Sequence, residues 1–173
     1  MNYIISTSTN VLTLVLLWGL SVLCLSAELD KGLDAVSKGD RQTALNEWLP
    51  LAENGDAAAQ YNIGVMFDPD RYLRPSIENT KIALKWYTLA AEQGYSSAQQ
   101  NLGLLYAKGQ GVLRSYVRAF MWFSLAEITA IDVGMKKHSA ESRDIAATFM
   151  NASEIEEAKK LTQECIKRQF KGC

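Results

Sequence analysis

Two parts of this chain of 173 residues match each other closely enough to be copies of one structural unit. Residues 59–64 (AQYNIG) match residues 98–103 (AQQNLG) at an offset of 39 residues. Residues 83–91 (ALKWYTLAA) match residues 119–127 (AFMWFSLAE) at an offset of 36 residues. A period of this length is typical of units made of two helices, which are stable only when they stack on their neighbours. The chain is therefore expected to form an array of stacked helix pairs.

Each unit is predicted to contain a short helix followed by a longer amphipathic one. The short helices are expected at 59–67 and 98–107, and the long helices at 80–93 and 115–128. Small and aromatic residues recur along one face of the first long helix, at Ala83, Trp86, Tyr87, Ala90 and Ala91. Because this spacing places them on one side of a helix, the aromatic side chains are predicted to be core residues and not ligand contacts.

The composition agrees with a mostly α-helical protein. All three prolines lie between residues 50 and 75, while Leu and Ala are the most frequent residues. Hydrophobic residues make up 48% of the chain and charged residues 21%, which excludes an intrinsically disordered chain. The net charge of −1 excludes a uniformly basic protein, so no nucleic-acid partner is expected.

The N-terminal segment has the composition of a targeting signal. Residues 1–27 contain no charged side chain, and residues 11–25 are almost wholly apolar. Fifteen helical residues would cover only about 22 Å, less than the roughly 30 Å of a bilayer core. We therefore expect residues 1–27 to be a signal peptide, cleaved near Ala27, of a periplasmic or secreted protein that keeps no membrane span. The alternative is an uncleaved anchor.

Removal of this segment leaves two cysteines, Cys165 and Cys173. An even number of cysteines in an exported chain suggests one disulfide, here near the C-terminus; the alternative is two free thiols. The chain has a single histidine, His138, so no metal site is expected.

The repeated blocks resemble Sel1-like repeats, which are relatives of the tetratricopeptide repeat. The resemblance covers about residues 28–130 and implies a right-handed α-α superhelical solenoid that holds other proteins. It divides this region into a degenerate first repeat (28–55) and two full repeats (56–94 and 95–130). Residues 131–173 are expected to form capping helices, and residues 151–173 resemble the closing helix of exported bacterial members. Asn151 and Glu154 have the spacing of a capping box at the start of the last helix.

One segment departs from the family pattern. The second full repeat contains the Gly-Gln-Gly-Val linker at 109–112, but the first has the longer sequence DPDRYLRPSIENT at 68–80. This segment is either a local binding element or a tolerated insertion, and the insertion is the simpler interpretation.

No catalytic motif accompanies the repeats. The chain has neither a Ser-x-x-Lys sequence nor the nucleophile and phosphate-binding motifs of hydrolases and nucleotide-binding proteins. We therefore predict a non-enzymatic scaffold or regulator without cofactor, whose partner is a protein or peptide of the cell envelope. The alternative is a cell-wall-associated protein that binds peptidoglycan or β-lactams, with or without hydrolase activity.

The charge is unevenly distributed along the chain. Residues 28–70 carry a net charge of −6 and residues 71–173 a net charge of +5. This division indicates either solvated surfaces, electrostatic steering of a partner, or stacking of copies end to end.

The partner is expected on the side of the first helices that the resemblance assigns to the concave surface. At about 100° per residue, one side of each first helix packs inward and the other lines that surface. The predicted contact residues are Tyr61, Val65, Asp68, Gln100, Leu104 and Lys108.

Overall fold

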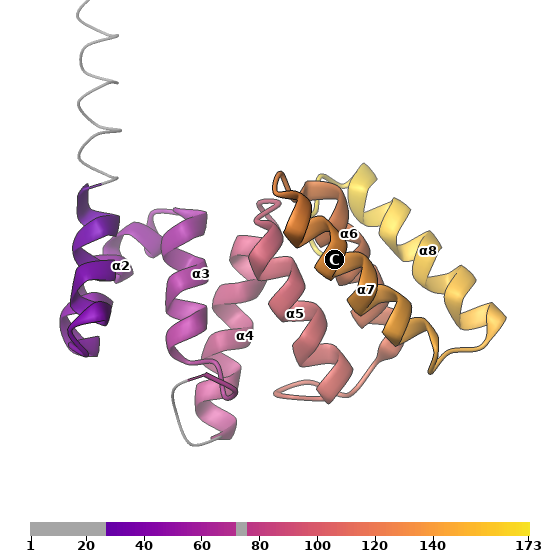
Figure 1. The fold of residues 1–173 in the computed structure, drawn as a ribbon, viewed down its shortest axis with the longest axis horizontal. Coiled ribbons are helices and arrows are strands. Elements are labelled where there is room, and N and C mark those ends of the chain that lie inside the picture. The colour runs from indigo at the N-terminus through magenta and orange to yellow at the C-terminus, as the bar shows by residue number, and fades with distance from the viewer. Residues whose placement is uncertain (1–26, 72–75) are drawn as a thin grey trace, which may run out of the picture. The chain divides into compact units, whose positions relative to one another are not determined.

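The computed structural model describes residues 27–71 and 76–173, and these form an all-α protein (Figure 1). The expected signal peptide, except Ala27, lies outside the described residues, as does part of the 68–80 segment. Residues 27–37 are helical, and the helices that follow are α2 (Arg41–Glu53), α3 (Ala57–Met66), α4 (Ile77–Ala91), α5 (Ser96–Lys108), α6 (Tyr116–Thr129), α7 (Val133–Ala147) and α8 (Ala152–Lys167). The predicted fold class, helix pairs in a repeat array, is confirmed. The chain divides into two compact units, residues 1–51 and 52–173, which are described separately.

In the first unit, the helix at 27–37 and helix α2 pack through a glycine and a tryptophan. The buried Trp48 indole donates a hydrogen bond of 3.1 Å to the carbonyl oxygen of Leu29. A Cβ atom at Gly32 would overlap the same indole ring. The absence of a side chain at residue 32 therefore lets the two helices approach closely.

The second unit repeats this contact in each helix pair. Gly64 on α3 lies against the ring of Tyr87 on α4, and Gly103 on α5 lies against the ring of Phe123 on α6. A Cβ atom at either glycine would lie 2.5 Å from a ring carbon, which is far inside van der Waals contact. Both rings are buried, as their spacing in the sequence predicts.

In the second unit, two buried glutamines each bond to the carbonyl oxygen of a residue eight positions earlier. The Gln60 amide donates to the Ala52 carbonyl oxygen at 2.9 Å, and the Gln99 amide donates to the Ala91 carbonyl oxygen at 3.1 Å. The two donors, Gln60 and Gln99, are 39 residues apart, and so are the two acceptors, Ala52 and Ala91. This distance equals the offset between the repeats. The repeat therefore preserves a side-chain hydrogen bond to the free carbonyl end of the preceding helix.

Helix ends follow the signals in the sequence. Gly55 and Gly94 have positive φ values of 95° and 80°, the conformation that glycine allows after a helix. Asn151 and Glu154 form the predicted capping box at the start of α8.

The last helix departs from the pairing of the earlier ones. Helix α3 packs on α4, and α5 on α6, but α8 packs on α6 and makes few contacts with α7 (Figure 1). Helix α6 therefore supports both α7 and α8.

Candidate functional site

Three of the predicted contact residues are apolar or aromatic and half-buried on successive first helices. Tyr61 and Val65 lie on α3, and Leu104 lies on α5. The Tyr61 ring packs 5.9 Å from Tyr87 and 5.1 Å from Tyr95, measured between ring centroids. These contacts hold Tyr61 in place while part of its surface stays accessible. We call Tyr61, Val65 and Leu104 the first-helix face.

Two further predicted contact residues are buried and bonded within the protein. Asp68 accepts a 2.8 Å hydrogen bond from the hydroxyl of Tyr87, and only 7% of Asp68 is exposed. Burial, followed by the charge of Asp68, raises the pKa of Tyr87 well above its ordinary value. Gln100 is 3% exposed and donates to the hydroxyl of Ser142 on α7 at 2.9 Å. Their polar groups thus connect helices, and their part in partner binding stays a prediction.

The sixth predicted residue, Lys108, is exposed but paired. Its ammonium lies 2.5 Å from a carboxylate oxygen of Asp70, whose other oxygen accepts a hydrogen bond from the Gln110 amide. The bond from Lys108 holds the pKa of Asp70 below its ordinary value. The described start of the 68–80 segment is thereby tied to the C-terminal end of α5.

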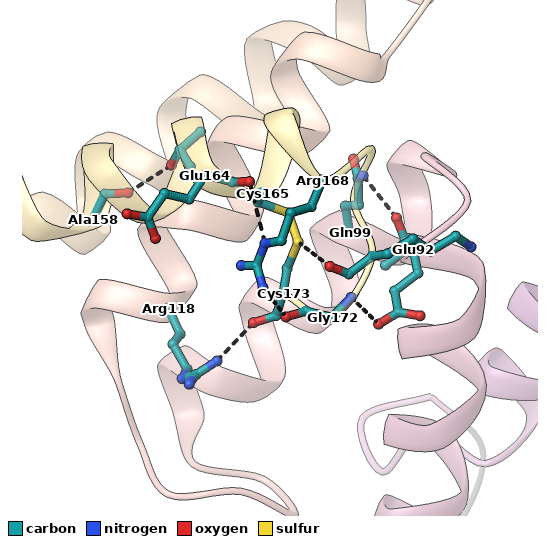
Figure 2. The surroundings of a disulfide bond; sticks show 12 residues. Glu92, Gln99, Arg118, Ala158, Glu164, Cys165, Arg168, Gly172 and Cys173 are labelled. Atoms are coloured by element: carbon teal, nitrogen blue, oxygen red, sulfur yellow. Dashed lines mark hydrogen bonds between the residues drawn. A yellow bond between two sulfur atoms is a disulfide. The ribbon is translucent and has the colours of Figure 1, made fainter.

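Cys165 and Cys173 form a disulfide, with Cα atoms 5.5 Å apart, which confirms the predicted pair over two free thiols (Figure 2). Figure 2 shows that the cross-linked tail is held from two other helices. Arg118 on α6 donates to the Cys173 carbonyl oxygen at 3.0 Å, and the Gly172 amide donates to Glu92 at 2.9 Å. The disulfide therefore belongs to a tie between α8, α6 and the end of α4.

Sequence reasoning missed a groove between α7 and α8. Its volume is about 520 Å³, and its floor is formed by Phe120, Ser124 and Ile128 of α6. The walls comprise Arg143 and Asp144 of α7 and Ile155, Lys159, Thr162, Gln163 and Ile166 of α8. The spacing of Ala158 and Cys165, seven residues apart, indicates one buried face of α8. Nothing in the sequence indicates that this face packs on α6.

Among residues 27–71 and 76–173, no cluster of three or more His, Cys, Asp or Glu side chains could hold a metal ion. Over the same residues, no helix combines the length and the apolar character needed to cross a bilayer.

Comparison with known families identifies the repeats. Residues 57–95 and 96–127 each match the Sel1 repeat. An F-box protein of Arabidopsis thaliana is 36% identical over 86 residues, which are 50% of this chain and 23% of that protein. The DAP3-binding cell death enhancer 1 of Rattus norvegicus is 35% identical over 81 residues, or 47% of this chain and 15% of that protein. The chain thus spans less than a quarter of either curated relative.

Solved bacterial structures share the fold. A protective antigen of uropathogenic Escherichia coli with an SLR fold is 27% identical, with a TM-score of 0.72 over 84% of this chain and 31% of that chain. A Sel1 repeat protein from Oxalobacter formigenes, at 23% identity, matches with a TM-score of 0.53 over 84% of this chain and 66% of that chain, which shows a shared fold. Repeat matches and helix packing together show that residues 57–127 of this chain are Sel1 repeats.

Proposed function

We propose that this chain is a non-enzymatic scaffold of the cell envelope that binds a protein or peptide through the first-helix face. Sel1 repeats are typically scaffolds that mediate protein interactions. The proposal rests on a difference in exposure and bonding between the apolar and the polar residues among the predicted contact residues. Tyr61, Val65 and Leu104 keep accessible apolar surface, whereas Asp68 accepts a hydrogen bond from Tyr87 and the Gln100 amide nitrogen donates one to Ser142. Burial of apolar side chains would therefore supply most of the binding free energy.

The cell envelope is proposed on two grounds. The uncharged, apolar N-terminal segment has the composition of an export signal. The Cys165–Cys173 disulfide suits an oxidising compartment, because thiols are kept reduced in the cytosol. Cell fractionation, with intact mass before and after alkylation, tests both grounds. A reduced protein that stays in the cytosol would rule out this location.

The binding surface is tested by crosslinking in cells that export the full chain. A photoreactive amino acid at position 58, one turn before Tyr61 and Asn62 on α3, should capture a specific protein. Val65→Asp and Leu104→Asp should abolish that crosslink, because each places a charge on apolar contact surface. The matched control is Leu89→Asp on α4, an exposed leucine outside the first-helix face.

Two outcomes decide the test. Loss of the crosslink in Val65→Asp but not in Leu89→Asp, with both variants folded by circular dichroism, supports binding through this face. Equal capture by all variants, or no specific crosslink at all, contradicts it.

A further inference from the structure

The turn between α6 and α7 projects two apolar side chains into solvent. Ile131 is 97% exposed and Val133, the first residue of α7, is 77% exposed, whereas Ala130 before them is buried. Asp132 lies between the two and accepts a hydrogen bond of 2.8 Å from the Met135 amide, which caps α7 and orders the turn. We call Ile131 and Val133 the α6–α7 tip.

The cross-linked C-terminal tail lies beside this tip. The ring of Phe170 and the methyl group of Thr129, the last residue of α6, both face Gly94. A Cβ atom at Gly94 would lie 3.2 Å from the ring and 3.9 Å from the methyl group. Figure 1 shows the C-terminal end of α8 and the start of α7 at the same end of the second unit. Because Thr129 precedes Ile131 by only two residues, the tail and the tip share one surface.

The tail brings unpaired positive charge to this surface. Lys167, Arg168 and Lys171 are exposed, and none of them forms an ion pair with another residue that the structure describes. Arg168 is held by a hydrogen bond of 3.0 Å to the carbonyl oxygen of Gly172, which leaves its charge uncompensated. Three cations thus lie close together in the sequence, next to the apolar tip.

Neighbouring carboxylates do not cancel this charge. Residues 128–141 and 160–173, with the two side chains of other helices that bond to the tail, carry a net charge of +3. The balance stays positive when the ion-paired cluster around Arg143, which carries −1, and an α-carboxylate at Cys173 are added. The seven basic residues are Arg118, Lys136, Lys137, Lys160, Lys167, Arg168 and Lys171, and the four acidic ones are Glu92, Asp132, Glu141 and Glu164.

A projecting apolar tip beside unpaired cations matches the surface of a bilayer. Apolar side chains on such a tip gain free energy when they enter the boundary between headgroups and acyl chains, and a fluid bilayer adapts to their shape. Lysine and arginine side chains are attracted by anionic headgroups. A protein partner would instead have to supply a pocket shaped for the tip and carboxylates placed around it. A bilayer meets both features without a matched pocket.

We infer that the α6–α7 tip and the tail dock on an anionic phospholipid bilayer. Ile131 and Val133 enter the boundary between headgroups and acyl chains, while Lys167, Arg168 and Lys171 face the headgroup phosphates. This role goes beyond the proposed binding of a protein, and it uses a surface separate from the first-helix face.

Sedimentation with vesicles tests the proposal. The protein, isolated from cells that export it, is mixed with vesicles of phosphatidylglycerol and phosphatidylcholine, or of phosphatidylcholine alone. It should bind the anionic vesicles at least roughly tenfold more tightly, and added salt should reduce the difference. Because residues 1–27 carry no charged side chain, this difference reports on the rest of the chain. Equal binding to both kinds of vesicle would overturn the proposal.

Charge reversal in the tail locates the electrostatic part. The double variant Lys167→Glu, Lys171→Glu should lose the preference for anionic vesicles. The matched control is Lys81→Glu, Lys85→Glu, which changes two exposed lysines of α4 with the same spacing of four residues and should keep the preference. Equal losses in both double variants would mean that only the total charge matters, and would contradict docking through the tail.

Substitution at the tip locates the apolar part. Ile131→Asp should weaken binding to anionic vesicles roughly tenfold, because it removes an apolar side chain from the bilayer and adds a negative charge. Leu113→Asp is the matched control: Leu113 is 91% exposed in the loop before α6, at the opposite end of that helix, and its variant should still bind. If Ile131→Asp is unfolded by circular dichroism, Val133→Asp replaces it.

Insertion separates a bilayer from an acidic protein as the partner. The new indole of Ile131→Trp should be quenched by brominated phospholipids beyond the quenching of the parent, whereas that of Leu113→Trp should not. Binding to polyglutamate without binding to either kind of vesicle would assign the surface to an acidic protein and overturn the proposal. Val65→Asp should leave vesicle binding unchanged, so failure here and failure of the proposed function are distinguishable.

Discussion

The hydroxyl of Tyr87 donates a hydrogen bond of 2.8 Å to the carboxylate of Asp68, and both side chains are buried. The same positions in the next repeat are Phe123, 36 residues after Tyr87, and Ala107, 39 residues after Asp68. Both polar groups are therefore absent there together. Since a buried donor without its acceptor is costly, the hydroxyl and the carboxylate form a unit that is kept or replaced as a pair.

We predict that Asp68→Ala lowers the free energy of unfolding by about 1–3 kcal/mol, because it leaves the buried Tyr87 hydroxyl without an acceptor. Tyr87→Phe should also destabilise the protein, since it leaves a buried carboxylate with one partner fewer. The double variant, which imitates the next repeat, should lose clearly less than the sum of the two. Urea denaturation of the four proteins provides this double-mutant cycle. Additive losses would show that the two groups are not coupled.

A second prediction concerns the glycines beneath the aromatic rings. Gly64→Ala and Gly103→Ala should each destabilise the protein by about 1–3 kcal/mol, because the new methyl group overlaps a buried ring. This cost outweighs the gain of about 0.5–1 kcal/mol expected when alanine replaces glycine in a helix.

Gly134→Ala is the control for this pair. Gly134 is on α7, and its added Cβ atom would meet only a carboxylate oxygen of Asp132, at 3.0 Å. This variant should lose far less stability than Gly64→Ala, because Gly134 is exposed and its new methyl group meets no buried ring. Thermal melts compare the three variants, and a loss in Gly134→Ala equal to that in Gly64→Ala would argue against ring contact as the cause.

The repeat contacts were predictable because they depend on residues at fixed spacing. Gly64 and Tyr87 recur as Gly103 and Phe123, so one match in the sequence locates the same packing twice. The disulfide followed from counting cysteines.

Whether each predicted contact residue is exposed to a partner or buried by a neighbouring helix could not be predicted equally well. A helical wheel places Asp68 and Gln100 away from the packed side of their own helices, but it contains no information about neighbouring helices. In the folded protein, the Tyr87 hydroxyl donates a hydrogen bond to Asp68, and the Ser142 hydroxyl of α7 accepts one from Gln100. The groove escaped prediction for the same reason, because Ala158 and Cys165 mark a buried face of α8 without indicating that it faces α6.

A third prediction concerns the disulfide. Reduction of the Cys165–Cys173 bond should lower stability by about 2 kcal/mol, the entropy expected for so short a loop. It should also loosen the tail, which then depends on its hydrogen bonds with Arg118, Glu92 and Arg168. Melting temperatures with and without reductant measure the effect. The double variant Cys165→Ser, Cys173→Ser is the control and should not respond to reductant; a response there would assign the effect elsewhere.

The fourth prediction uses the pH dependence of the pair between Asp70 and Lys108. The pKa of Asp70 in the folded protein lies below its ordinary value of 3.8. The pair therefore stabilises the fold above pH 3.8, and this contribution is lost as the pH falls through the lowered pKa and the carboxylate is protonated. Because both side chains are nearly half exposed, the contribution at neutral pH should be no more than about 1 kcal/mol.

Asp70→Asn isolates this contribution. The variant should be slightly less stable than the parent near neutral pH, and the difference should shrink with added salt and disappear well below pH 3.8. Glu157→Gln, at an exposed carboxylate of α8, is the control for removal of one surface charge. Urea denaturation at the two pH values measures each difference. A deficit in Asp70→Asn that persists at low pH would mean that the amide disturbs the turn after α3, and that the ion pair itself contributes nothing.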